Sequence, residues 1–226
     1  MNMTMFEQFT SPELALIPTS PLSILIPFFL IYHKPELIGN RMTTALAWFL
    51  KMFMLNMTSQ LTPKGQKWSH LLASLILMIL LSNLLSLLPY TFTSTSQLSM
   101  NMALALPLWL ATVITGLKNK PSSALAHLLP EGSPTPLIPF MILIETVSLL
   151  MRPIALGVRL TANITAGHLL MTMVSSAVIN LINTHISISS LALALLFLLT
   201  ILELAVACIQ AYVFVLLIIL YLQENT

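Results

Sequence analysis

The chain of 226 residues has few charged side chains and contains no aspartate. Charged residues make up 7% of it, whereas hydrophobic residues make up 57% and the mean hydropathy is +0.94. This composition excludes an ordinary soluble domain, because a soluble surface needs far more charged residues. The sequence therefore predicts an integral membrane protein.

The sequence also lacks the features of several functional classes. A formal net charge of +2 and the absence of a run rich in lysine and arginine argue against nucleic-acid binding. One cysteine, Cys208, cannot build a disulfide framework. The sequence shows no nucleotide-binding motif, metal-ligand constellation or nucleophilic triad. We therefore expect no cofactor, no metal and no catalytic activity of the chain's own.

Apolar segments predict an all-α protein with about five membrane-spanning helices, because about 20 apolar residues cross a hydrocarbon core of about 30 Å. One interfacial amphipathic helix is expected over residues 41–61, which mix Trp48 and Phe49 with Lys51 and several threonines. We expect a single membrane domain over residues 1–226, without an internal repeat. The predicted crossings cover residues 14–32, 68–90, 98–117, 137–182 and 186–222.

The last two apolar stretches are too long for upright helices. At 1.5 Å per residue they would measure about 69 Å and about 55 Å, well above the thickness of the hydrocarbon core. Pro153 permits a kink, but neither stretch contains the polar break that a complete turn would need. We expect a long, strongly tilted helical hairpin with its turn near Asn183 and Thr184.

Basic residues predict the orientation in the membrane. Seven of the nine lie on one face, because they precede the second crossing or follow the third. The inner side of a membrane, which corresponds to the cytoplasmic side, carries such an excess of basic residues. The N-terminus is therefore expected on the outer side and the C-terminus on the inner side. The seven residues are Lys34, Arg41, Lys51, Lys64, Lys67, Lys118 and Lys120.

Ionisable side chains within membrane segments mark ion or proton pathways by default. Arg159 lies near the middle of residues 137–182, where an arginine stays protonated and costs about 2.5 to 3.5 kcal/mol even on lenient insertion scales. In an antiparallel hairpin, residues equally distant from the turn lie at the same depth. Gln210 is therefore expected level with Arg159.

The other ionisable side chains sort by depth around Arg159. Glu203 and His168 are expected at nearly the same level, about 14 Å from the arginine toward the outer face, and Glu145 about 21 Å from it toward the inner face. His168 points nearly opposite to Arg159 on the helix, so one continuous pore is not expected. Two offset half-pathways separated by Arg159 fit better. Histidine and glutamate exchange protons, which makes protons the expected cargo.

Structural roles remain alternatives for several of these residues. A bond between His168 and Thr172 or a serine explains this histidine about as well as a proton relay does. Asn163 and Gln210 can simply bridge two helices by hydrogen bonds. Glu145 can be one half of a structural ion pair.

Arg159 has no such simple alternative. A structural ion pair would need a carboxylate at the same depth, and Glu203 and Glu145 are both too far away along the axis. We therefore expect the counter-charge to come from another subunit. Cysteines placed near the arginine, at Asn163 or Leu156, are expected to reach that subunit.

The run ALGVRLTANITAGH over residues 155–168 resembles the signature of subunit a of rotary ATP synthases in their mitochondrial form. The resemblance extends over nearly the whole chain, and LPEGSPTPL over residues 129–137 is similar to the animal form encoded in the organelle. It implies the mitochondrial inner membrane, with the N-terminus toward the intermembrane space and the C-terminus toward the matrix. It also implies as partners a ring of c subunits, a peripheral stalk, small membrane subunits and lipids.

The resemblance further implies roles for single residues. In that family the arginine matching Arg159 faces the proton-carrying carboxylates of the rotating ring. Positions matching His168 and Glu203 take up protons from the intermembrane space, and the one matching Glu145 releases them to the matrix. The residues that line the surroundings of the arginine match Asn163 and Gln210.

The implied function is that of a stator subunit that conducts protons and couples their flow to rotation and ATP synthesis. Two alternatives belong to other classes: a proton-coupled secondary transporter, and a structural membrane subunit of a respiratory complex. The transporter would show an inverted repeat and broken helices at the midplane, and the sequence shows neither. The structural subunit would leave Arg159 unexplained.

Overall fold

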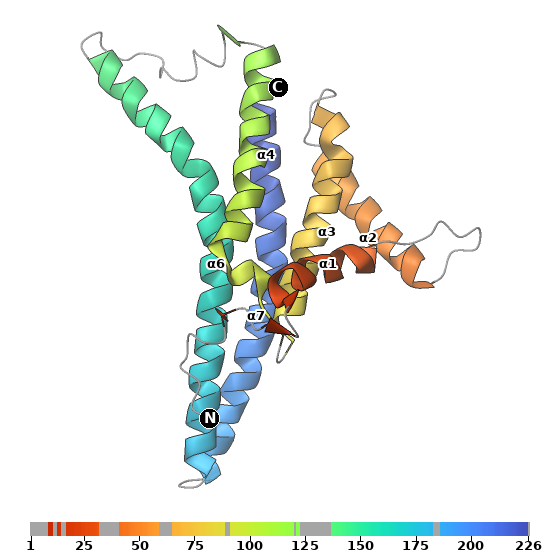
Figure 1. Cartoon of the computed structure of the whole chain (residues 1–226), viewed down its shortest axis with the longest axis vertical. Helices are drawn as coiled ribbons and strands as arrows, with labels where there is room; N and C mark the ends of the chain where they lie inside the picture. The colour runs from red at the N-terminus through yellow and green to blue at the C-terminus, as the bar shows by residue number, and fades with distance from the viewer. Residues whose placement is uncertain are drawn as a thin grey trace. The chain divides into compact units, whose positions relative to one another are not determined.

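The structure is a computed structural model that describes residues 9–10, 13–14, 17–31, 41–58, 65–88, 91–119, 121–122, 137–182 and 186–225. The described residues are overwhelmingly helical (Figure 1). Two strands of two residues each, β1 (Glu13–Leu14) and β2 (Ile17–Pro18), pair antiparallel. The prediction of an all-α membrane protein is confirmed, and the strand pair is a local addition to it.

Four of the described helices are long and apolar enough to cross a membrane. Their apolar sequences satisfy every backbone hydrogen bond internally when helical, which a hydrocarbon core demands. They cover the segments in which the sequence predicts the last four crossings. The four are α3 (Ser69–Ser86), which follows the 3-10 turn η2 (Gly65–Trp68), α4 (Leu98–Asn119), α6 (Ile138–Ile182) and α7 (Ile186–Asn225).

The first predicted crossing contains a shorter helix, α1 (Thr19–Ile31). Its 13 residues measure about 20 Å, which is less than a hydrocarbon core of about 30 Å. The chain before it is extended in β1 and β2, and Pro27 lies inside it. The described helix therefore covers part of the predicted crossing. A crossing over residues 14–32 stays a prediction.

The segment with the predicted interfacial helix forms α2 (Arg41–Thr58). Trp48 is 64% exposed and Leu55 is 58% exposed, and the charged Lys51 is exposed among them. Such a mixture of large apolar and basic side chains suits the boundary between lipid and water. Whether α2 lies on a membrane surface stays a prediction.

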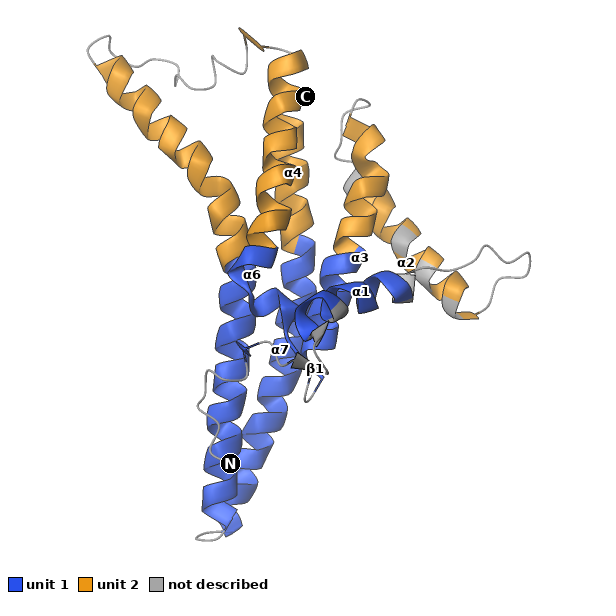
Figure 2. Ribbon diagram, in the orientation of Figure 1, with its two compact units in different colours: residues 1–32, 77–100, 159–212 blue, residues 33–76, 101–158, 213–226 orange. Residues whose placement is uncertain are grey.

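The chain divides into two compact units (Figure 2). Unit 1 contains residues 1–32, 77–100 and 159–212, and unit 2 contains residues 33–76, 101–158 and 213–226. Four of the described helices, α3, α4, α6 and α7, contribute residues to both units. The division therefore cuts through continuous helices, and a single membrane domain over residues 1–226 stays a prediction.

In unit 1, α6 and α7 pack side by side as an antiparallel pair. Leu160 and Ile164 of α6 are 1% and 2% exposed, and the small Ala207 and Ala211 of α7 are also buried. Small side chains allow helices to approach closely in a membrane. This packing confirms the prediction that the last two apolar stretches form a hairpin of two long helices. The predicted turn, at residues 183–185, lies outside the described residues.

In unit 2, the C-terminal part of α7 supplies the largest buried apolar group. Its members, Phe214, Val215, Ile218, Ile219 and Leu222, are at most 2% exposed. The orange part of α6 curves in Figure 2, and Pro153, a residue that bends helices, lies within this part. Met102 of α4 approaches Gly157 of α6 closely, because a Cβ atom added at the glycine would lie 2.6 Å from the Met102 sulfur.

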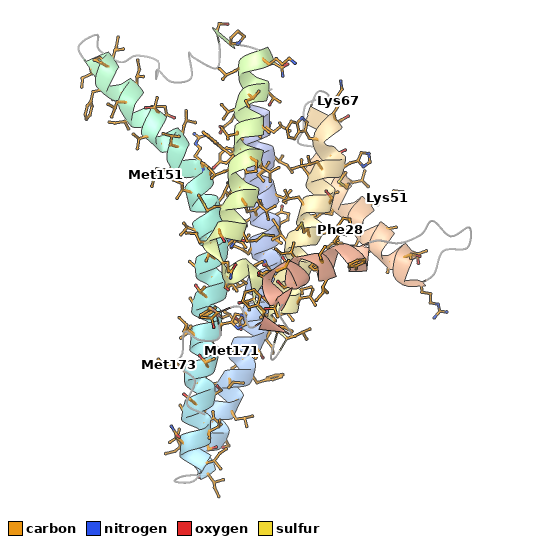
Figure 3. All side chains as sticks on the ribbon, viewed as in Figure 1. Phe28, Lys51, Lys67, Met151, Met171 and Met173 are labelled. Atoms are coloured by element: carbon orange, nitrogen blue, oxygen red, sulfur yellow. The ribbon has the colours of Figure 1, made fainter. Side chains whose placement is uncertain are left out.

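Large apolar side chains also project away from the neighbouring helices. Phe28 of α1 and Met151 and Met173 of α6 are about half exposed or more (Figure 3). An apolar outer surface of this kind is what a lipid environment accommodates and water does not. The protein is a multi-pass membrane protein.

Candidate functional site

Glu203 of α7 has its carboxylate buried within unit 1. The residue is 6% exposed, and neither of its two Oε atoms has a hydrogen-bond partner among the described residues. A buried carboxylate without any partner is costly, so the group requires a proton, a cation or water. Such a group is suited to exchanging protons with a mobile donor, because no fixed side chain has to be displaced.

A glycine of α6 makes room for this carboxylate. A Cβ atom added at Gly167 would meet Oε1 of Glu203 and lie 3.0 Å from its Cδ atom. The neighbouring His168 has a buried Nε2 atom without a hydrogen-bond partner among the described residues. The contact between Gly167 and Glu203 thus brings Glu203 and the His168 region to the same level of the hairpin, as the hairpin register predicts.

Sequence reasoning did not identify Gly167 as part of the site. A signal was present, because glycine inside a helix costs about 1 kcal/mol relative to alanine and needs a reason to be there. The structure supplies that reason in the space that the Glu203 carboxylate occupies.

Thr172 does not form the hydrogen bond to His168 that was the structural alternative for this histidine. The Thr172 hydroxyl donates to the Leu169 carbonyl oxygen at 2.9 Å, within its own helix. Ser175 does the same toward the Thr172 carbonyl oxygen at 2.9 Å. These hydroxyls are satisfied locally and do not serve the histidine.

Asn163 and Gln210 connect α6 to α7 in unit 1. The Nδ2 atom of Asn163 donates a hydrogen bond to Oε1 of Gln210 at 2.9 Å. Gln210 is 6% exposed, so this bond satisfies a polar group that is taken out of water. The structure therefore brings together the two residues expected near the level of Arg159, and it shows the bridge between helices that was the structural alternative for them.

Arg159 is exposed and stands apart from these pairs. Among the described residues, no carboxylate forms an ion pair with it; the recorded ion pairs belong to Arg152. The exposed side of α6 in unit 1 also carries Ala162, Asn163 and Ala166, whereas Leu160 is buried. Small neighbours leave room for another helix to approach the arginine.

Leu156 does not meet the expectation placed on it. It is 3% exposed within unit 2 and therefore packs inside the described structure. Sequence reasoning chose it for its distance from the arginine along the chain and did not resolve which side of the helix is covered.

Charged side chains gather around Arg152 in unit 2. Its Nη1 atom donates to Oε2 of Glu224 at 2.9 Å, and its Nη2 atom lies 4.0 Å from Oε1 of Glu145. The guanidinium carbon lies 5.2 Å from the centre of the Tyr221 ring. Glu145 and Glu224 therefore meet at one level, as the hairpin register predicts, and Glu145 takes part in the ion pair that was its structural alternative.

A buried asparagine of α3 is a further residue that sequence reasoning missed. Asn83 is 0% exposed, and its Nδ2 atom donates to the carbonyl oxygen of Ala207 at 3.4 Å. Its Oδ1 atom has no partner among the described residues. Ala207 lies one helical turn after Glu203, so Asn83 fixes α3 against the part of α7 that carries the buried carboxylate. An asparagine within an apolar helix was the available signal.

The described residues contain no group of three or more histidine, cysteine or acidic side chains that could hold a metal ion. The site residues of unit 1 come instead as single side chains from three helices, α3, α6 and α7: Asn83, Asn163, His168, Glu203 and Gln210. This spacing suits the stepwise transfer of small species such as protons.

Comparison with known proteins identifies the family. The sequence model described as ATP synthase A chain matches residues 16–223. Three relatives named ATP synthase F(0) complex subunit a align over 100% of both chains: those of Lycodon semicarinatus at 75% identity, Gallus gallus at 60% and Struthio camelus at 59%. The family resemblance seen in residues 155–168 thus extends over the full length, and the chain belongs to the ATP synthase A chain family.

Proposed function

We propose that this chain is the proton-translocating stator subunit in the membrane sector of a rotary ATP synthase. Its relatives are named as subunit a of the F(0) complex, and four of its helices are long and apolar enough to cross a membrane. It works without a catalytic site of its own. Its partners are a ring of c subunits, the peripheral stalk, small membrane subunits and lipids of the mitochondrial inner membrane.

Arg159 carries this proposal. It is an exposed, permanently charged side chain that forms no ion pair with any described residue. A carboxylate on the ring supplies the missing counter-charge as it passes. The positive charge favours the ionised carboxylate and prevents a proton from crossing directly between the two half-channels. Proton flow therefore requires the ring to turn.

Glu203 and His168 form the uptake half-channel. Their buried atoms lack partners among the described residues and can hand a proton to the ring. A neutralised ring carboxylate enters lipid at far lower cost than an anion. Asn163 and Gln210, joined by a hydrogen bond, keep α6 and α7 together in the same unit as the arginine.

Glu145 receives the proton after nearly a full turn and forms the release half-channel toward the matrix. The distribution of charge along the sequence supports this direction. Eight of the nine basic residues fall within the sequence ranges of unit 2, and Arg159 is the ninth. By the positive-inside rule, the loops and helix ends that carry this excess of basic residues face the matrix. The N-terminus then faces the intermembrane space.

Cross-linking tests the approach of the ring to Arg159. In a Cys208→Ser background, a cysteine replacing the exposed Asn163 and labelled with a thiol-reactive photo-cross-linker should cross-link to a ring subunit on illumination and block rotation. A cysteine replacing Leu160, which is 1% exposed, is the matched control and should not. Mass spectrometry identifies the partner. Cross-links from residue 163 only to stator subunits would contradict the proposal and favour a structural subunit.

A further inference from the structure

The two glutamates near Arg152 contact it unequally. The distance from Nη1 to Glu224 is 2.9 Å, which is a charge-assisted hydrogen bond. The distance from Nη2 to Glu145 is 4.0 Å, which is beyond hydrogen-bond length. One guanidinium therefore faces two carboxylates, and only Glu224 is bound to it directly.

Helix α7 holds the guanidinium by a second contact. Tyr221 and Glu224 lie three residues apart and share one side of α7. The Tyr221 ring lies 5.2 Å from the guanidinium carbon, within the range of a cation–π interaction. Arg152 extends from α6 but is anchored on α7. Glu145 lies seven residues before Arg152 on α6 and makes no direct hydrogen bond to the guanidinium.

We propose that the two acids have different tasks: Glu224 anchors Arg152, and Glu145 alone exchanges protons. The inference rests on the proposed function, because that function places Glu145 on the release path. Arg152 is then a positioning residue. While Glu145 is ionised, the guanidinium stabilises its charge across the 4.0 Å gap. When Glu145 takes up a proton, Arg152 stays neutralised by Glu224, so no unpaired cation is left behind.

This division of tasks removes a barrier from the release step. Opening a direct, charge-assisted hydrogen bond would add a cost to that step. Glu145 has no such bond to open, whereas Glu224 does. Glu145 takes up and releases a proton while Arg152 and Glu224 keep their charges.

A double-mutant cycle tests the proposal. Complexes carrying Glu145→Gln, Glu224→Gln and Arg152→Gln, singly and in pairs, are reconstituted into vesicles, and proton flux is measured per assembled complex under an imposed potential. We expect Glu224→Gln alone to lower the flux by about twofold and to have no further effect in the Arg152→Gln background. Glu145→Gln should lower the flux roughly tenfold in both backgrounds.

Other outcomes overturn the proposal. A loss on Glu224→Gln in the Arg152→Gln background as large as that on Glu145→Gln would show that Glu224 conducts protons itself. An unchanged flux in Glu145→Gln would remove Glu145 from the path, while a flux that still depends on Arg159 would leave the proposed function standing. Arg152→Lys retains the cation and should recover most of the flux lost in Arg152→Gln; failure to recover it would contradict positioning by charge. If Arg152→Gln does not assemble, the two single glutamate variants decide: a flux loss in Glu224→Gln as large as that in Glu145→Gln would contradict the proposal.

Discussion

The two units treat the same kinds of charged group in opposite ways. In the described part of unit 1, the Glu203 carboxylate is buried without a partner and Arg159 is exposed without a carboxylate. In unit 2, Arg152 contacts one carboxylate at 2.9 Å, a second at 4.0 Å and an aromatic ring. Groups that the chain satisfies itself hold structure in place. Groups that it leaves without a partner are the ones that can bind a proton or pair with a moving subunit.

The largest effect is expected at Arg159, with which no described carboxylate pairs. Arg159→Gln or Arg159→Ala should reduce coupled ATP synthesis to at most about a few per cent, while assembly persists, because removing the charge abolishes the gate and relieves a membrane cost. Arg159→Lys should also fail, since its point charge has a different geometry. ATP synthesis by purified, reconstituted complexes measures this. Arg152→Gln is the control, and an equal loss there would break the distinction between the units.

The buried carboxylate of unit 1 should matter more than the exposed one of unit 2. Glu203→Gln should slow proton flux roughly tenfold, because it removes a proton-exchanging group, whereas Glu224→Gln should stay within about twofold. Flux per assembled complex and the rate of ring rotation are the measurements. Equal effects in the two variants would show that burial without a partner does not mark the conducting residue.

Two glycines give a matched comparison of packing. Gly167→Ala places a methyl group against the Glu203 carboxylate and should cost roughly 1 to 3 kcal/mol of overpacking, with a loss of proton flux. Gly157→Ala meets the flexible Met102 side chain, and alanine gains about 1 kcal/mol of helix propensity, so its effect should be near zero.

Thermal unfolding and flux of the assembled complex compare the two glycine variants. The sharper result is a flux loss in Gly167→Ala at unchanged assembly, which would place the effect on the carboxylate itself. A larger loss of flux in Gly157→Ala would contradict the role of Gly167.

The smallest effects are expected at locally satisfied hydroxyls. Thr172 of unit 1 and Thr146 of unit 2 each donate to the carbonyl three residues earlier, at 2.9 Å and 2.8 Å. Thr172→Val and Thr146→Val should therefore change flux by less than about twofold, because a hydroxyl bonded within its own helix contributes little. A strong loss in Thr172→Val alone would mean that this hydroxyl serves His168 after all.

The sequence alone predicted the helical hairpin and much of its register. Length and apolarity define both long helices, and equal distance from the turn brings Glu145 opposite Glu224 and the His168 region opposite Glu203. The hydrogen bond between Asn163 and Gln210 does not follow from equal distance, which places Gln210 level with Arg159, and was foreseen only as a structural alternative. The hairpin and its register depend on helix periodicity, which is regular enough to carry over long distances.

Other features depend on contacts that periodicity does not determine. The extended start before α1 depends on the pairing of β1 with β2. The position of Asn83 against Ala207 depends on which side of α3 meets α7. The preference of Arg152 for Glu224 depends on the path of a long side chain, because both carboxylates lie within its reach. Such choices are made by packing between helices far apart in sequence.

The exposed Arg159 also affects how stable the polypeptide is in the membrane before it assembles with its partners. A newly made chain that inserts into a bilayer without its partner bears the full energetic cost of a desolvated, uncompensated cation. Binding of a carboxylate-bearing neighbour lowers the free energy of the inserted form and leaves that of the aggregated or degraded form unchanged. The abundance of the chain in its membrane should therefore follow the supply of that neighbour, and orphaned copies should be cleared by proteolysis.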